Sequence, residues 1–76
     1  MTPRLPVVTS QQLARVAERL GFHLDRQKGS HAVYCRDSDG ARIVIPMHAG
    51  KSLKPKTLSG ILDDMGISPD HLREIL

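Results

Sequence analysis

The sequence predicts an α+β fold, a two-layer sandwich in which a three-stranded antiparallel sheet carries two helices on one face. Two segments repeat apolar residues at spacings of three and four, which line one side of a helix. Between them lie three short runs that resemble β-strands, separated by turn residues. Both amphipathic helices must bury their apolar stripes on the same side of a single sheet. The expected order is α-β-β-β-α, followed by a short C-terminal helix.

The first helix is predicted to start after Thr9. Thr9 and Gln12 have the spacing of a capping box, in which two side chains satisfy free backbone amides at a helix start. Its apolar stripe consists of Leu13, Val16, Ala17 and Leu20. Gly21 follows and ends the helix, because glycine adopts the left-handed conformation readily.

Three strands are predicted to form an antiparallel meander. The segment "FHLDRQ" alternates Phe22 and Leu24 with polar residues, as a half-buried strand does, and "KGS" supplies a turn. The next run, "HAVYCR", ends at the turn "DSDG". The third run, "ARIVIP", is rich in β-branched residues and stops at Pro46, which has no amide for a ladder.

The second helix is predicted to start at Pro55, since proline suits the first helical position. Its stripe consists of Leu58, Ile61, Leu62 and Met65, and Gly66 ends it. Ser68 then caps a short terminal helix that begins with Pro69. That helix carries an apolar edge of Leu72, Ile75 and Leu76.

The length and composition indicate one small soluble domain spanning residues 1–76. A chain of this size buries only about 60% of the surface that its unfolded form exposes. The segment "MTPRLPVV" lacks the apolar core of a signal peptide, and no apolar run is long enough to cross a membrane. Cys35 is the only cysteine, which excludes an internal disulfide and a cysteine-based metal site. We therefore expect a cytoplasmic protein without a membrane partner.

The charges are distributed unevenly along the chain. Residues 26–56 contain seven basic and two acidic residues, whereas residues 57–76 contain one basic and four acidic residues. A basic middle favours a polyanionic partner. On charge alone, an ordinary solvated surface with no partner remains a serious competing interpretation.

The order and size of the elements resemble the double-stranded-RNA-binding fold, in which one helix, a loop and the start of the other helix meet a nucleic-acid backbone. The residues from "KGSHAVYCR" to "IPMHAGKSLKPKTLSGILDDMGIS" resemble the HicA family, small toxins of toxin-antitoxin pairs that cleave messenger RNA. The resemblance covers nearly the whole chain, and it includes Gly29-Ser30-His31, Pro46, His48 and Gly50-Lys51. It implies that His31 is the catalytic residue. It also implies a HicB-like antitoxin that forms an inhibitory complex, with operator DNA bound by the complex through the antitoxin.

Histidine suits the chemistry that this resemblance implies. Metal-free RNA cleavage removes a proton from a ribose 2′-hydroxyl and returns a proton to the departing 5′-oxygen. With a reference pKa of about 6.5, histidine both accepts and donates protons near neutrality. The developing phosphorane charge needs cations, and the nearest in sequence are Lys28, Lys51, Lys54 and Lys56.

Strand alternation places His31 on the same side as Val33 and Cys35. If those two residues face the helices, His31 lies at the rim of that layer, near the loop that carries Lys51 and Lys54. Gly29 and Ser30 would form the turn that holds the imidazole, with Ser30 as a phosphate contact or as plain turn chemistry.

Other polar residues have weaker assignments. His48 is either a second proton carrier, an RNA-backbone contact, or an ordinary loop histidine. The segment "GKSLKPK" places lysines at a helix start, where phosphate binds favourably. His23 and His71 are expected at the surface. The four histidines lack the paired spacing of zinc sites, so we expect no metal and no cofactor.

Two other functions fit the same pattern. A double-stranded-RNA-binding module would share the fold and the lysines but would have no use for His31. A protein-interaction domain would use the basic residues only against an acidic partner. The scarcity of aromatic residues, with one tyrosine and one phenylalanine, indicates recognition of backbone and shape in either RNA-binding case.

Overall fold

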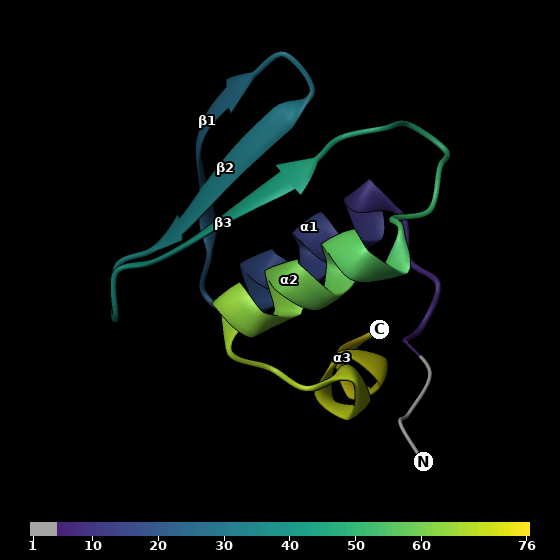
Figure 1. Cartoon of the computed structure of the whole chain (residues 1–76). Helices are drawn as coiled ribbons and strands as arrows, with labels where there is room; N and C mark the ends of the chain where they lie inside the picture. Colours follow the sequence, from purple (N-terminus) through teal and green to yellow (C-terminus); the bar gives the residue numbers. More distant parts are fainter. Residues whose placement is uncertain (1–4) are drawn as a thin grey trace.

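A computed structural model describes residues 5–76 (Figure 1). The elements follow the predicted order: α1 (Ser10–Arg19), β1 (His23–Lys28), β2 (His31–Arg36), β3 (Ala41–Pro46), α2 (Pro55–Met65) and α3 (Pro69–Ile75). The strands form one antiparallel sheet in the order β1-β2-β3. The first four residues of the expected domain lie outside the described range.

The helix ends have the predicted chemistry. Thr9 and Gln12 form the capping box of α1, with the Gln12 backbone amide donating to Thr9 Oγ1 at 3.2 Å. Pro55 occupies the start of α2, and Gly66 ends it with a φ of 77°. Ser68 caps α3 by accepting a hydrogen bond from the His71 amide.

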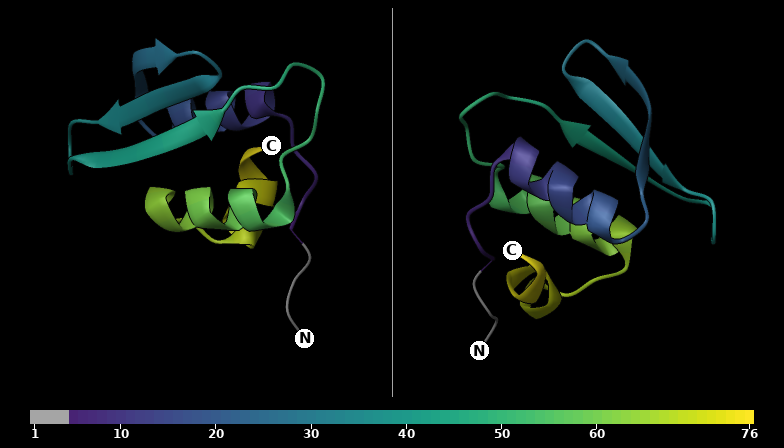
Figure 2. Two further views of the ribbon diagram at one scale, coloured as in Figure 1. Left: turned by 45° about the horizontal axis from the view of Figure 1, so that its top comes forward. Right: turned by 180° about the vertical axis from the view of Figure 1, so that it is seen from behind.

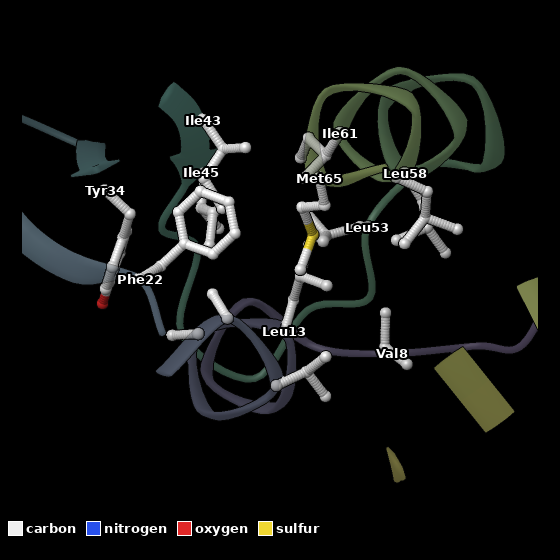
Figure 3. Close-up of a cluster of buried hydrophobic side chains, with 14 of the residues drawn as sticks. Val8, Leu13, Phe22, Tyr34, Ile43, Ile45, Leu53, Leu58, Ile61 and Met65 are labelled. Atoms are coloured by element: carbon white, nitrogen blue, oxygen red, sulfur yellow. The ribbon is translucent and has the colours of Figure 1, made fainter. Parts of the chain in front are cut away.

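The core lies between one face of the sheet and the two longer helices. All four predicted stripe residues of α2 are buried, and so are Leu13, Val16 and Ala17 of α1. Figure 3 shows side chains from the sheet and both helices meeting in one cluster. α3 lies against the helices on their side remote from the sheet, as the views in Figures 1 and 2 agree. The other face of the sheet is left uncovered by residues 5–76.

The side chains of β2 that face the helices are not the ones considered in the sequence analysis. Ala32 and Tyr34 are buried against the helices, so Val33 and Cys35 belong to the opposite, uncovered face. Burial raises the pKa of the Tyr34 hydroxyl, with a smaller contribution from the nearby Glu18 carboxylate. Tyr34 is therefore a core residue, as is Phe22, and neither provides an exposed stacking platform.

β1 also departs from simple alternation. Every residue of β1 is exposed, and Leu24, expected to be inward, is 49% exposed. The pairing register shifts between Leu24 and Arg26, which marks a β-bulge at Asp25. The extra residue reverses the alternation of side chains after Asp25. Arg26 and Lys28 therefore lie on the face of Val33 and His31, whereas strict alternation would place them on the face of Leu24.

Candidate active site

His31 is the first residue of β2 and lies exposed on the uncovered face of the sheet. The turn before it contains Gly29, whose φ of 59° is in the left-handed region. The Ser30 carbonyl accepts a hydrogen bond from the Met47 amide, which ties this turn to the end of β3. His31 therefore does not lie at the rim of the helix layer, because the buried residues of β2 are those of the other alternation.

A cation from β1 lies opposite His31 in the sheet. Lys28 pairs directly with His31 across the antiparallel ladder, so both side chains project from the same face. Directly opposed residues have Cβ atoms about 5 Å apart. The Lys28 ammonium therefore lies within reach of any anion that contacts the imidazole.

Pro46 pairs with His31 from the other side and also borders a separate hollow. This hollow, called here the lysine hollow, has a volume of about 400 Å³ and is lined by Ser10, Pro46, His48, Lys51, Ser52, Leu53, Lys54 and Thr57. The structure thus brings Lys51 and Lys54 together with His48, whereas the sequence analysis expected these lysines beside His31. His31 itself does not line the lysine hollow, although it adjoins it through Pro46.

Ser10 holds the loop of the lysine hollow and was not anticipated from sequence. Its hydroxyl donates to the Pro46 carbonyl at 2.6 Å and accepts from the His48 amide at 3.2 Å. Ser10 is fully buried, so these two bonds fix the chain direction where β3 ends. The sequence analysis did not single out Ser10; the available signal was its position three residues before Leu13, which places both on the buried side of the helix.

Lys54 lines the lysine hollow from the start of α2, whereas Lys56, His23 and His71 lie outside it. Lys54 is the N-cap residue of α2 and makes no side-chain capping bond, while Lys56 is exposed in the first turn but does not line the hollow. His23 is exposed, with Nε2 3.2 Å from the Asp37 carboxylate. His71 is exposed on α3.

Neither a metal-ligand cluster nor a membrane-spanning helix is found among the described residues. Within residues 5–76, no three histidine, cysteine or acidic side chains are grouped as metal ligands would be. In the same range, no helix combines the length and apolar character needed to cross a membrane.

The fold and site define a small α+β protein in which an exposed histidine, His31, pairs with Lys28 and adjoins, through Pro46, a hollow lined by Lys51 and Lys54. A family model described as the HicA toxin of bacterial toxin-antitoxin systems matches residues 10–67. This match covers most of the chain, and the protein belongs to the HicA toxin family. A comparison with curated proteins finds no significant match.

Proposed function

We propose that this HicA-family toxin is an endoribonuclease that cleaves mRNA without a metal and uses His31 as the catalytic residue. The observation that carries the proposal is the pairing of an exposed His31 with Lys28 on one face of the sheet. A substrate phosphate that contacts the imidazole also meets a cation there. The lysine hollow begins on the other side of His31, at Pro46.

The chemistry is an internal transesterification. The imidazole of His31 takes the proton of a ribose 2′-hydroxyl, and the 2′-oxygen attacks the adjacent phosphorus. The bond from phosphorus to the 5′-oxygen breaks, and the 5′-oxygen receives a proton from the imidazolium. The products are a 2′,3′-cyclic phosphate and a 5′-hydroxyl. Lys28 stabilises the charge that develops on the phosphorane oxygens.

His48, Lys51, Lys54 and Lys56 serve as RNA-backbone contacts in this proposal, together with the Gly29-Ser30 turn. The backbone amide of His48 donates to Ser10, which fixes the main chain of His48 at the lysine hollow. Cytoplasmic mRNA is the natural polyanion for such a surface, and a HicB-like antitoxin with an acidic contact surface would neutralise the toxin by covering it.

The decisive experiment incubates the purified chain with single-stranded RNA in excess chelator and identifies the new ends by mass spectrometry. Cleavage to 2′,3′-cyclic phosphate ends is expected from the unaltered chain, and His31→Ala should lower the rate by about 10²- to 10⁴-fold. His71→Ala is the matched control, because His71 is an exposed histidine on α3. A metal requirement would overturn the mechanism. Unchanged cleavage by His31→Ala would overturn the catalytic assignment.

The RNA-binding alternative is separated by the same variants. A chain that binds RNA but never cleaves it, with or without His31, is a binding module. The antitoxin proposal is tested by titrating a HicB-like protein into the cleavage reaction, and inhibition should be complete at a stoichiometric ratio. Failure to inhibit, or inhibition that needs large excess, contradicts that part of the proposal.

A further inference from the structure

The uncovered side of the sheet forms a continuous surface that includes His31. Figures 1 and 2 show α1 and α2 on one side of the sheet and no element of residues 5–76 on the other. The two sides differ within a single strand: Val44 is 44% exposed, whereas its neighbours Ile43 and Ile45 are buried. The open face is therefore available to a partner.

The strand register arranges nine residues of this open face in three rows. The first row is Lys28, His31 and Pro46, the second is Arg26, Val33 and Val44, and the third is His23, Cys35 and Arg42. Successive rows are about 7 Å apart, because a strand advances about 3.4 Å per residue. The row that contains Arg42 therefore lies about 14 Å from the row that contains His31.

The charges of the open face favour an anion. Its rows contain Arg26, Lys28 and Arg42 and no acidic residue, although the exposed Asp37 carboxylate lies 3.2 Å from His23 in the row of Arg42. Arg26 Nε lies 3.4 Å from Asp25 Oδ2, but both side chains are exposed, so this pair is weak. Among residues 5–76, neither Lys28 nor Arg42 forms an ion pair.

The acidic residues of the C-terminal part lie in the other layers. Asp63 and Asp64 are exposed on α2, and Asp70 and Glu74 are exposed on α3. A polyanion therefore meets less repulsion on the open face than beside the ends of these helices.

The centre of the open face suits a single strand better than a duplex. Val33 and Val44 form an apolar pair between the cations, which unstacked bases can contact. In-line attack by a 2′-oxygen also needs a ribose-phosphate unit free of duplex geometry. Arg42 and Lys28 would hold phosphates on either side of this apolar pair.

We propose that substrate RNA lies as a single strand along the open face, from Arg42 over Val33 and Val44 to His31, and continues into the lysine hollow. This inference rests on the proposed function, since it assigns a path to the substrate of His31. It differs from the double-stranded-RNA-binding fold, in which a helix and the start of another meet the backbone. It also makes Arg42 an RNA-binding residue, which the sequence alone did not indicate.

The test compares two charge reversals, both in the inactive His31→Ala chain. Arg42→Glu changes the open face, whereas Arg15→Glu makes the same change on α1, where Arg15 borders a hollow shared with Ile75 and Leu76. Binding of a fluorescein-labelled single-stranded RNA of mixed sequence is measured by anisotropy at low salt. We expect Arg42→Glu to raise the Kd about tenfold and Arg15→Glu to change it less than about twofold. Both variants change the net charge equally, so a difference between them reports the charge next to the bound RNA. Circular dichroism confirms that both variants fold.

A neutral variant gives an independent readout. The logarithm of the binding constant falls as the logarithm of the salt concentration rises. Arg42→Gln should make this slope less steep by about 0.7, the value for one lost phosphate contact on a single strand. In the active chain, Arg42→Gln should raise KM and leave kcat within about twofold, since the residue is remote from the reacting atoms.

The outcomes separate this inference from the proposed function. If Arg15→Glu weakens binding as much as Arg42→Glu, the RNA path over the open face is wrong. It is also wrong if Arg42→Glu weakens only association with a HicB-like protein, because the face then belongs to a protein partner. The cleavage assay with His31→Ala is unaffected by either result, so catalysis by His31 stands or falls separately.

Discussion

The two faces of the sheet show how one strand serves two purposes. On β2, Ala32 and Tyr34 pack against the helices, while His31, Val33 and Cys35 belong to the open face. Side chains on the packed face contribute to stability through burial. Side chains on the open face contribute little to stability and are free to contact a substrate. Substitutions on adjacent residues should therefore have different consequences.

The largest expected effect compares two neighbours on β3. Ile45 is fully buried, and Ile45→Ala should lower the free energy of unfolding by about 2–5 kcal/mol. Val44→Ala, on the open face, should change it by less than about 1 kcal/mol. Urea denaturation of both variants checks the difference. Equal losses would show that the open face is packed against something in solution.

The next effect concerns activity on β1. Lys28→Met removes the cation opposite His31 and should lower kcat by about ten- to a hundredfold. This loss of kcat is smaller than the loss from removing a rigidly held donor to the developing oxyanion. Gln27→Met is the control, since Gln27 pairs with Ala32 on the other face. Steady-state cleavage kinetics measure both. If Gln27→Met lowers kcat as much as Lys28→Met does, the assignment of Lys28 and Gln27 to opposite faces of the sheet is wrong.

A smaller effect compares two glycines. Gly29 has a φ of 59°, and Gly29→Ala should destabilise the chain by about 1–2 kcal/mol through backbone strain. Gly60 lies within α2 with open space around it, so Gly60→Ala should stabilise by about 0.5–1 kcal/mol. Thermal melting of both variants should show shifts of opposite sign. Shifts of the same sign would contradict the left-handed turn before His31.

The smallest effect is a pH dependence at the packed side of the sheet. Arg36 packs over the Phe22 ring at 4.4 Å and donates to the Leu20 carbonyl and to Asp39. The hydrogen bond from Arg36 lowers the pKa of Asp39 from 3.8 to about 2, with help from the Ala41 amide. A depressed carboxylate pKa stabilises the fold above about pH 4, and this contribution is lost as the pH falls toward 2.

The free energy of unfolding of Asp39→Asn should therefore fall less steeply with decreasing pH than that of the unaltered chain. Urea titrations between pH 5 and 2 measure it. If the stability of Asp39→Asn declines as steeply as that of the unaltered chain over this interval, the Arg36–Asp39 interaction is not a source of that decline.

The sequence determined the elements, because their signals are local. The capping box at Thr9, the prolines that open α2 and α3, and the glycine that ends α2 act on their own turns. The stripe spacing of α2 likewise fixes which of its sides is buried. The family and its histidine motif are also properties of the sequence.

The tertiary structure decided which face of the sheet is buried and what surrounds His31. Ala32 and Tyr34 compete with Val33 and Cys35 for the core, and both pairs are apolar enough to occupy it. Packing against the helices and pairing with Ile43 and Ile45 settle the choice. The bulge at Asp25 then turns Lys28 toward His31, although strict alternation places Lys28 on the face of Leu24. A bulge depends on pairing with another strand, so no local pattern in β1 alone specifies it.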